Sequence, residues 1–226
     1  MNLSFRCLRS AVFASGASFA LASCVSAPAA SGAGPVAAFP PATVTVAETA
    51  PPPPRAEVPP LIAEALAALK AHSAQVTYRD KIAVVDFSLP SSEPRFHIVD
   101  VATGEIERSW LVAHGSGSDP TGTGMVQSFS NRHGSHATSR GAYVTAEPYI
   151  GKYGRSQRLI GLDPDNDRAM DRAIVIHGAP YVDPALIPRQ GRIGRSQGCF
   201  AFELGEVEAV MGTLGKGRLI YAGKPA

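Results

Sequence analysis

The 226-residue chain is poor in cysteine, and its folded part is expected to keep one thiol. Of its three cysteines, Cys7 lies in an N-terminal segment typical of an export signal, and Cys24 lies at the end of that segment. Cys199 then remains alone, which excludes a disulfide within the domain. A free thiol in an exported protein needs a chemical explanation, because disulfides form outside the cytoplasm.

An excess of charge of one sign is also missing. The chain has 21 Lys and Arg and 19 Asp and Glu, and loss of Arg6 and Arg9 with the signal would leave 19 of each sign. No stripe of lysine and arginine stands out along the sequence. Nucleic acid is therefore not expected as a partner.

A long hydrophobic run is absent too. The apolar segment AVFASGASFALA, residues 11–22, is too short for a transmembrane helix, so we expect residues 1–23 to be removed after export. It ends in Leu-Ala-Ser-Cys, which resembles a bacterial lipobox and predicts acylation of Cys24 and a lipid anchor in a membrane. The alternative is an ordinary secretory signal cut after Ala29 or Ala30.

Proline and alanine dominate the next segment, residues 24–59, which includes four consecutive prolines at 51–54. Such a composition buries little surface and favours extended conformations, so we expect a tether. At about 3.1 Å per residue it would reach on the order of 100 Å. Val25 after the lipobox cysteine resembles outer-membrane sorting signals, so we expect a periplasmic domain anchored to the outer membrane.

Residues 60–226 are expected to form one domain. Apolar spacing predicts a helix over 60–72 and a second over 204–214 that ends at Gly215. Six short strand-like runs lie between or beyond them: KIAVVDFSL, RFHIVDV, ERSWLVAHG, GAYVTAE, RAIVIHG and GRLIYAG. They do not alternate regularly with helices. We therefore predict a mainly β fold, an antiparallel sandwich or barrel with a few short peripheral helices.

Glycines frame the single thiol in GRSQGCFAF. Gly194 and Gly198 permit a tight turn before Cys199, in which backbone amides are free to point at a substrate oxygen. A thiol becomes nucleophilic only as the thiolate, so it needs a base. His177 ends an apolar run and precedes Cys199 by 22 positions, a length that suits a strand that loops and returns beside itself. Alone, such a histidine is more often structural; with Cys199 it indicates a catalytic pair.

IHGAPYV and GRIGRSQGCFAF together resemble the signature of the murein L,D-transpeptidase catalytic domain (the YkuD-like superfamily), in a branch with GRSxGCxA. VAHGSGSD, SFSNRHGSHATSRGAYVT and GKYGRSQRLIGLD resemble that branch as well, so the similarity covers about residues 78–222. It implies an L,D-transpeptidase-like fold and a cysteine acyltransferase that acts on peptidoglycan stem peptides without a cofactor. It also implies a carbapenem target.

The resemblance implies the chemistry and the residues that carry it. Cys199 would attack a tetrapeptide stem and expel D-alanine, and the amine of a neighbouring stem would resolve the acyl-enzyme into a cross-link. His177 would be the base, oriented by the backbone carbonyl of Gly178. The implied oxyanion and substrate-binding residues are Gly198, Gln197, Ser196, Arg195, Tyr181, Asn131 and Ser135. Two of these stay open: Asn131 and Ser135 line the cleft, brace it, or only form a turn.

Other interpretations stay open at this point. Arg195 either meets the carboxylates of the stem or is simply solvated. The enzyme would be an L,D-carboxypeptidase if water resolves the acyl-enzyme, and the chain could instead be a non-catalytic wall-binding lipoprotein or a sortase-like or papain-like thiol transferase. The oligomeric state is unknown.

Two further expectations concern protons and metals. A thiolate–imidazolium pair would keep Cys199 ionised well below the ordinary cysteine pKa of about 8.5. His114, His133 and His136 match no known metal-ligand spacing, so no metal is expected.

Overall fold

The computed structural model describes residues 59–225. The predicted signal peptide (1–23), the lipidation site Cys24 and almost all of the predicted tether (24–59) lie outside the described residues and stay predictions. Within residues 59–225, no helix combines the length and the apolar character needed to cross a membrane.

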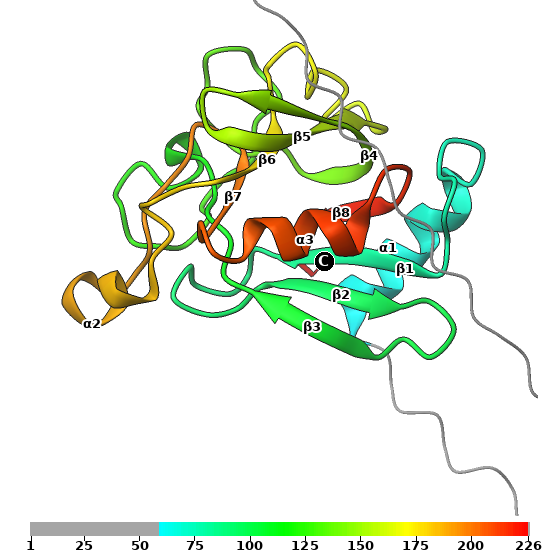
Figure 1. Cartoon of the computed structure of the whole chain (residues 1–226), viewed down its shortest axis with the longest axis horizontal. Helices are drawn as coiled ribbons and strands as arrows, with labels where there is room; N and C mark the ends of the chain where they lie inside the picture. Colours follow the sequence, from blue (N-terminus) through cyan, green and yellow to red (C-terminus); the bar gives the residue numbers. More distant parts are fainter. Residues whose placement is uncertain (1–58, 226) are drawn as a thin grey trace, which may run out of the picture. The chain divides into compact units, whose positions relative to one another are not determined.

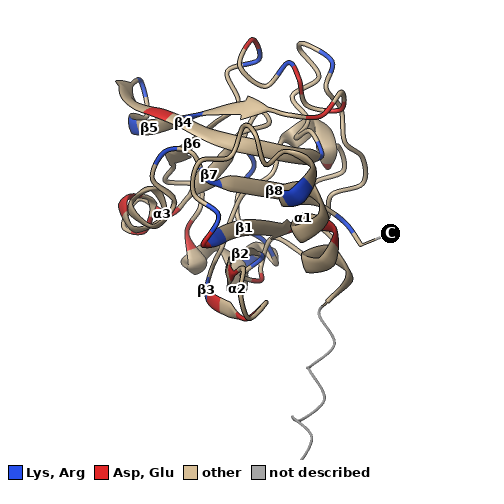
Figure 2. Ribbon diagram, turned by 90° about the vertical axis from the view of Figure 1, so that its right-hand side faces the viewer, with Lys and Arg blue, Asp and Glu red and all other residues tan. Residues whose placement is uncertain are grey.

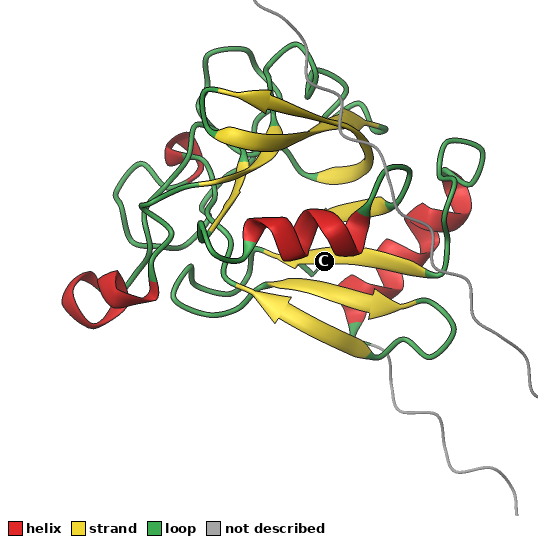
Figure 3. Cartoon of the chain, in the orientation of Figure 1, coloured by secondary structure: helices red, strands yellow, loops and turns green. Residues whose placement is uncertain are grey.

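Eight strands form a single mixed sheet in the order β3-β2-β1-β8-β4-β5-β6-β7 (Figures 1 and 3). The strands are β1 (Lys81–Asp86), β2 (Phe96–Asp100), β3 (Ile106–Trp110), β4 (Gly141–Gly151), β5 (Gly154–Gly161), β6 (Val175–Gly178), β7 (Phe200–Phe202) and β8 (Leu219–Gly223). The prediction of a mainly β fold is confirmed.

Two neighbouring pairs of strands are parallel, β1 with β8 and β6 with β7, so the expectation of an antiparallel sheet is wrong for these pairs. Parallel neighbours need a long crossover connection. Residues 179–199 supply it between β6 and β7, and most of the domain lies between β1 and β8. The β6–β7 crossover contains the short helix α2 (Ile187–Gln190).

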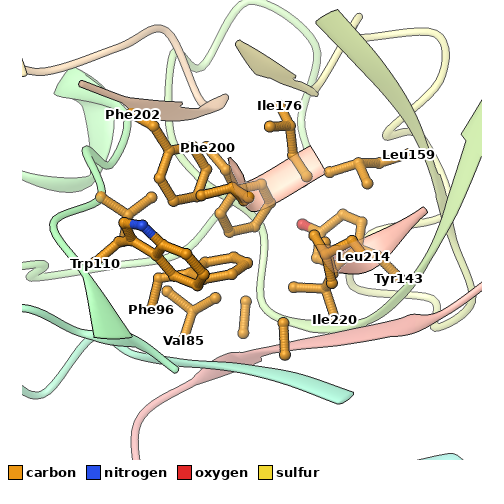
Figure 4. Packing of buried hydrophobic residues seen from close by; sticks show 14 of the residues in the cluster. Val85, Phe96, Trp110, Tyr143, Leu159, Ile176, Phe200, Phe202, Leu214 and Ile220 are labelled. Carbon is orange, nitrogen blue, oxygen red and sulfur yellow. The ribbon is translucent and has the colours of Figure 1, made fainter. Parts of the chain in front are cut away.

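The sheet bends around its core so that strands near its two ends face each other. Phe96 of β2 and Phe202 of β7 lie with ring centroids 4.9 Å apart (Figure 4). Just after β3, the amide of Ala113 donates to the carbonyl of Ala201 in β7 at 2.9 Å. The strand order thus almost closes on itself, which gives the predicted barrel-like sandwich.

Two helices of eight residues or more cover the sheet. Helix α1 (Pro60–Ala71) buries Leu61, Ile62, Ala65 and Leu69 in a small second core. Strand β1 lies between this core and the main one, and its central residues 82–85 are all buried. A strand covered on both faces needs a continuous apolar run rather than alternation, as the sequence IAVV shows.

Helix α3 (Val207–Leu214) packs its apolar stripe on the main core. It begins three residues later than expected, because Leu204 lies outside the helix and is 59% exposed. Gly215 ends α3 as predicted, with a φ of +55°. Lysine, arginine, aspartate and glutamate lie mainly on the loops and at the ends of elements, as Figure 2 shows, and most of the strand surface is uncharged.

Candidate active site

The two residues of the predicted catalytic pair lie on one strand and immediately before its neighbour. Strands β6 and β7 run in parallel, with His177 opposite Ala201, and Cys199 immediately precedes β7. Both side chains line one cleft of about 400 Å³. The crossover between them therefore returns beside its own starting strand, as the sequence predicted.

His177 is almost completely buried and is held on two sides. Its Nδ1 lies 2.9 Å from the carbonyl oxygen of Gly178 and therefore carries the proton, because a carbonyl only accepts. The ring of Tyr153 stacks on the imidazole, with centroids 4.3 Å apart. Burial lowers the pKa of His177, the Gly178 carbonyl opposes this, and the charge of Lys152 adds to the lowering. At neutral pH the imidazole is uncharged, with Nε2 free of a proton and able to act as a base.

Cys199 is half-buried, and its thiol donates to the carbonyl oxygen of Ala173 at 3.5 Å. Burial raises the pKa of Cys199, although the backbone amide of Val175 and the charges of Arg172 and Lys152 oppose it. The resting pair is thus a neutral thiol and a neutral imidazole. These two shifts disfavour the expected thiolate–imidazolium pair in the resting state, because both charged forms lose hydration in the cleft.

The turn before Cys199 is closed by its own hydrogen bonds. The Ser196 hydroxyl donates to the Cys199 carbonyl at 2.7 Å and accepts the Gly198 amide at 3.1 Å. The Gly198 amide is therefore used inside the turn, which corrects its assignment to the oxyanion hole. Gln197 is exposed and lines the cleft.

Gly198 is needed for conformation and space. Its φ is +115°, and a Cβ there would lie 2.7 Å from Ile174 Cδ1 and 2.8 Å from the Ala137 carbonyl oxygen. At both distances a neighbouring atom would have to shift, and the backbone oxygen of Ala137 cannot do so as easily as the end of the Ile174 side chain. Glycine permits the approach of the thiol turn to the strand and loop behind it.

Arg195 also lines the cleft, and it is not simply solvated. Its guanidinium donates to the backbone carbonyl of Asp119 and lies 3.9 Å from the carboxylate of that residue. Asp119 is fully buried, and burial acts to raise its pKa. The amides of Gly124 and Thr123 outweigh that effect, so the pKa of Asp119 is lowered and the carboxylate is ionised.

Two more buried polar side chains stand behind Asp119. The guanidinium of Arg95 donates to Nδ1 of His114 at 2.6 Å, and Nε2 of His114 lies 3.5 Å from the Asp119 carboxylate. Burial first, and then the charge of Arg95, lowers the pKa of His114 to about 4. His114 is therefore neutral at pH 7, and Arg95, His114 and Asp119 form a buried polar chain that ends at Arg195.

Asn131 and Ser135 are not among the described residues that line the cleft. The Asn131 amide donates to the Pro164 carbonyl at 3.0 Å and to the Asp167 carboxylate at 2.6 Å. The Ser135 hydroxyl accepts from Arg172 at 3.2 Å. Both residues brace the loops around the cleft, so a substrate-binding role is replaced by a structural one. Tyr181 does line the cleft.

A family model described as the L,D-transpeptidase catalytic domain matches residues 57–222. The chain belongs to this family. No curated protein sequence matches the chain significantly.

Several solved structures resemble the chain at low sequence identity. An L,D-transpeptidase from Mycobacterium smegmatis is 13% identical, with 64% of this chain and 58% of that chain covered and a TM-score of 0.38. The helical cell shape determining protein Pgp2 of Campylobacter jejuni (K307A mutant) is 15% identical, with 73% and 55% covered and a TM-score of 0.40. The matched region thus spans less than two-thirds of these longer chains.

In this L,D-transpeptidase domain, the cleft contains residues that sequence reasoning missed. Arg172 and Lys152 supply two positive charges besides Arg195, and no aspartate or glutamate occurs among the described lining residues. Tyr153, His133 and His136 complete the walls. The segments GKYG and SFSNRHGSHATSRGAYVT, which contain Lys152, Tyr153, His133 and His136, belong to the motifs that resemble the family. The sequence alone does not show that these side chains line the cleft.

Proposed function

We propose that the protein is a peptidoglycan L,D-transpeptidase that acts through a Cys199 acyl-enzyme. The observation that carries the proposal is that Cys199 and His177 line one cleft, with His177 on β6, Cys199 immediately before the parallel neighbour β7, and Nδ1 of His177 fixed by the Gly178 carbonyl. The family membership of residues 57–222 supports it.

In the first half-reaction, the Cys199 thiol gives its proton to Nε2 of His177 while the sulfur bonds to the carbonyl carbon of the third stem residue. The Gly178 carbonyl keeps its hydrogen bond from Nδ1–H and so stabilises the imidazolium. The Cys199 amide, rather than that of Gly198, is the backbone donor we assign to the oxyanion. One such donor contributes about 2.7–4 kcal/mol to transition-state stability.

The tetrahedral intermediate then collapses. The C–N bond to the terminal D-alanine breaks, His177 returns its proton to the leaving amine, and a thioester remains on Cys199. In the second half-reaction, the side-chain amine of a neighbouring stem attacks the thioester and loses a proton to His177. The new amide is the cross-link, and Cys199 regains its thiol.

The charge of the cleft fits a substrate that carries carboxylates. Lys152, Arg172 and Arg195 face it, and the lining that the structure describes holds no acidic side chain. The buried Asp119 holds Arg195 at the wall. Peptidoglycan stems carry carboxylates, so Arg195 is the proposed contact for one of them.

Incubation of the purified protein with tetrapeptide muropeptides tests this function. Mass spectrometry is expected to show dimers with a 3→3 link and free D-alanine, and Cys199→Ala is expected to give neither. Tripeptide monomers without dimers would instead establish an L,D-carboxypeptidase. The absence of any reaction in both proteins would contradict the proposal.

A carbapenem provides an independent probe of the nucleophile. We expect a covalent adduct on the intact protein that is missing in Cys199→Ala. Equal masses before and after treatment would favour passive wall binding.

We also propose that the domain works at the periplasmic face of the outer membrane, tethered through acylated Cys24. The supporting evidence is the lipobox-like end of the N-terminal segment. Metabolic labelling with a palmitate analogue tests it, with Cys24→Ala as the matched control; equal labelling of both would contradict acylation at this position.

A further inference from the structure

A left-handed backbone residue touches the catalytic sulfur. Among residues 59–225, the two non-glycine residues with positive φ are Ala173 and His136, each at +53°. Both line the cleft, and the carbonyl of Ala173 accepts the thiol proton of Cys199 at 3.5 Å. Such conformations persist only where the surrounding structure enforces them, and they gather at active sites.

Arg172 provides that enforcement from the preceding position. Its Nη1 donates to the Ser130 carbonyl at 2.7 Å and to the Ser139 hydroxyl at 2.6 Å, while Nη2 donates to the Ser135 hydroxyl at 3.2 Å and to the Ala137 carbonyl. Four hydrogen bonds from one planar group join the segment before β6 to the loop before β4. Lysine has the charge but not the fork geometry that these bonds use.

The guanidinium also faces the sulfur electrostatically. The positive charge of Arg172 lowers the pKa of Cys199, and the smaller effect of Lys152 has the same sign. The other titratable groups of the cleft come from several elements: Tyr153 from the β4–β5 hairpin, His133 and His136 from the loop before β4, His177 from β6, Tyr181 after it, and Arg195 in the thiol turn. Within the described lining, no carboxylate competes for the cation.

We propose that Arg172 is a positioning residue, which fixes the Ala173 carbonyl against the Cys199 thiol and places a permanent positive charge beside the sulfur. When the S–H bond breaks, the proton passes to Nε2 of His177 and the electron pair stays on sulfur next to the guanidinium. In catalysis this role rests on the proposed transpeptidase function, but the charge can be tested on the thiol itself.

The test is the rate of alkylation of Cys199 by iodoacetamide as a function of pH, followed by peptide mass mapping on the full chain. The thiolate displaces iodide, so the rate reports ionisation of the sulfur. We expect Arg172→Gln to react about tenfold more slowly than the parent at about pH 8, with its profile moved to higher pH. Arg172→Lys keeps the charge and is expected to stay within about threefold of the parent.

Arg168→Gln is the matched control, because Arg168 is exposed in the same segment and is not among the described lining residues. It is expected to react like the parent. Equal profiles for Arg172→Gln and the parent, or an equal slowing in Arg168→Gln, would overturn the proposal.

The fork geometry has a second readout. If near-ultraviolet circular dichroism shows that Arg172→Gln is misfolded, Arg172→Lys still decides the positioning role. It is expected to be acylated by a carbapenem about tenfold more slowly than the parent while alkylation is almost unchanged. Unchanged acylation in Arg172→Lys would overturn the positioning role, whereas a parent that is not acylated at all would contradict the transpeptidase function instead.

Discussion

At the residue scale, the protonation of the proposed catalytic pair, Cys199 and His177, is set by burial and by one backbone carbonyl. Gly178 fixes the proton of His177 on Nδ1, and loss of hydration keeps both the imidazole and the Cys199 thiol neutral. In the proposed reaction, proton transfer therefore accompanies attack on the substrate instead of preceding it. In that reaction, the negative charge of the attacking sulfur and the positive charge of the imidazolium form only when the substrate is bound.

The pH dependence of acylation follows from His177. Its pKa is lowered, so the neutral base persists to lower pH than in an ordinary histidine, and acylation by a carbapenem is expected to decline only below about pH 6.5. His177→Gln is expected to lose 10²- to 10⁴-fold in acylation rate, the usual contribution of a positioned base. Stopped-flow measurements across pH check both; an acid limb at or above pH 6.5 would contradict the neutral resting pair.

Gly198→Ala tests the space behind the thiol turn. The new Cβ would meet Ile174 and the Ala137 carbonyl at a φ that disfavours side chains, so we expect a loss of about 1–3 kcal/mol or more in unfolding free energy and loss of acylation. Gly205→Ala is the control, since a Cβ there meets open space and its φ is not positive. Urea denaturation of the two variants measures the difference; equal midpoints would show that the turn shifts at no cost.

At the element scale, β7 links the core to the chemistry. Its three residues are buried, Phe202 packs edge-on against Phe96 from the far end of the sheet, and Cys199 immediately precedes the strand. Packing of β7 therefore decides the position of the sulfur.

Phe202→Ala is expected to lower the unfolding free energy by about 3–5 kcal/mol, because loss of the ring leaves a cavity between the two ends of the sheet. Ile150→Ala, at a position that is 79% exposed, is expected to change it by less than about 0.5 kcal/mol. Thermal or denaturant unfolding measures both. Similar losses of unfolding free energy in the two variants would mean that the packing of Phe202 in β7 does not stabilise the core.

Elements were predictable where a local pattern decided them. Helix α1 follows from apolar periodicity, and six of the strands follow from short strand-like runs in the sequence. Strand β5 was missed because its sequence GRSQRLIG looks polar; Gln157 is buried there only because its amide donates to the carbonyls of Ala146 and Gly215, a tertiary contact. Strand β7 is too short to carry a pattern of its own.

The residues of the site also fall into two groups, those that local sequence reveals and those that depend on tertiary contacts. Cys199 and His177 lie in compact motifs with glycine neighbours, so local sequence was enough to find them. The role of Arg172 depends on four partners in a loop more than thirty positions away, and no periodicity encodes that meeting. The possible cleft position of Asn131 is wrong for a similar reason. Its amide donates to the Pro164 carbonyl and to the Asp167 carboxylate, and the sequence does not reveal these partners.

At the scale of the whole molecule, the buried chain of Arg95, His114 and Asp119 links stability to pH. His114 has a pKa of about 4 in the folded state and about 6.5 when unfolded, so the unfolded chain binds the extra proton between these values. Stability is therefore full above about pH 6.5 and falls as the pH drops toward 4, by up to about 3 kcal/mol.

His114→Gln checks this linkage, because glutamine can accept from Arg95 and donate toward Asp119 without titrating. The variant is expected to show a shallower loss of unfolding free energy between about pH 6.5 and 4 than the parent. Chemical denaturation at several pH values measures the slopes. Parallel curves for the two proteins would assign the acid sensitivity to other groups.

The crossover between β6 and β7 is a segment in which the chain could be cut without separating His177 from Cys199. It carries the chain from His177 to Cys199 through the exposed residues Arg189 and Gln190, and Val182 and Ile193 near its two ends pack in a small apolar cluster with Ala201. A single protease cut after Arg189 would thus leave two polypeptides that stay associated through the β6–β7 ladder. Each would carry one residue of the proposed catalytic pair, and the functional protein would be their noncovalent complex.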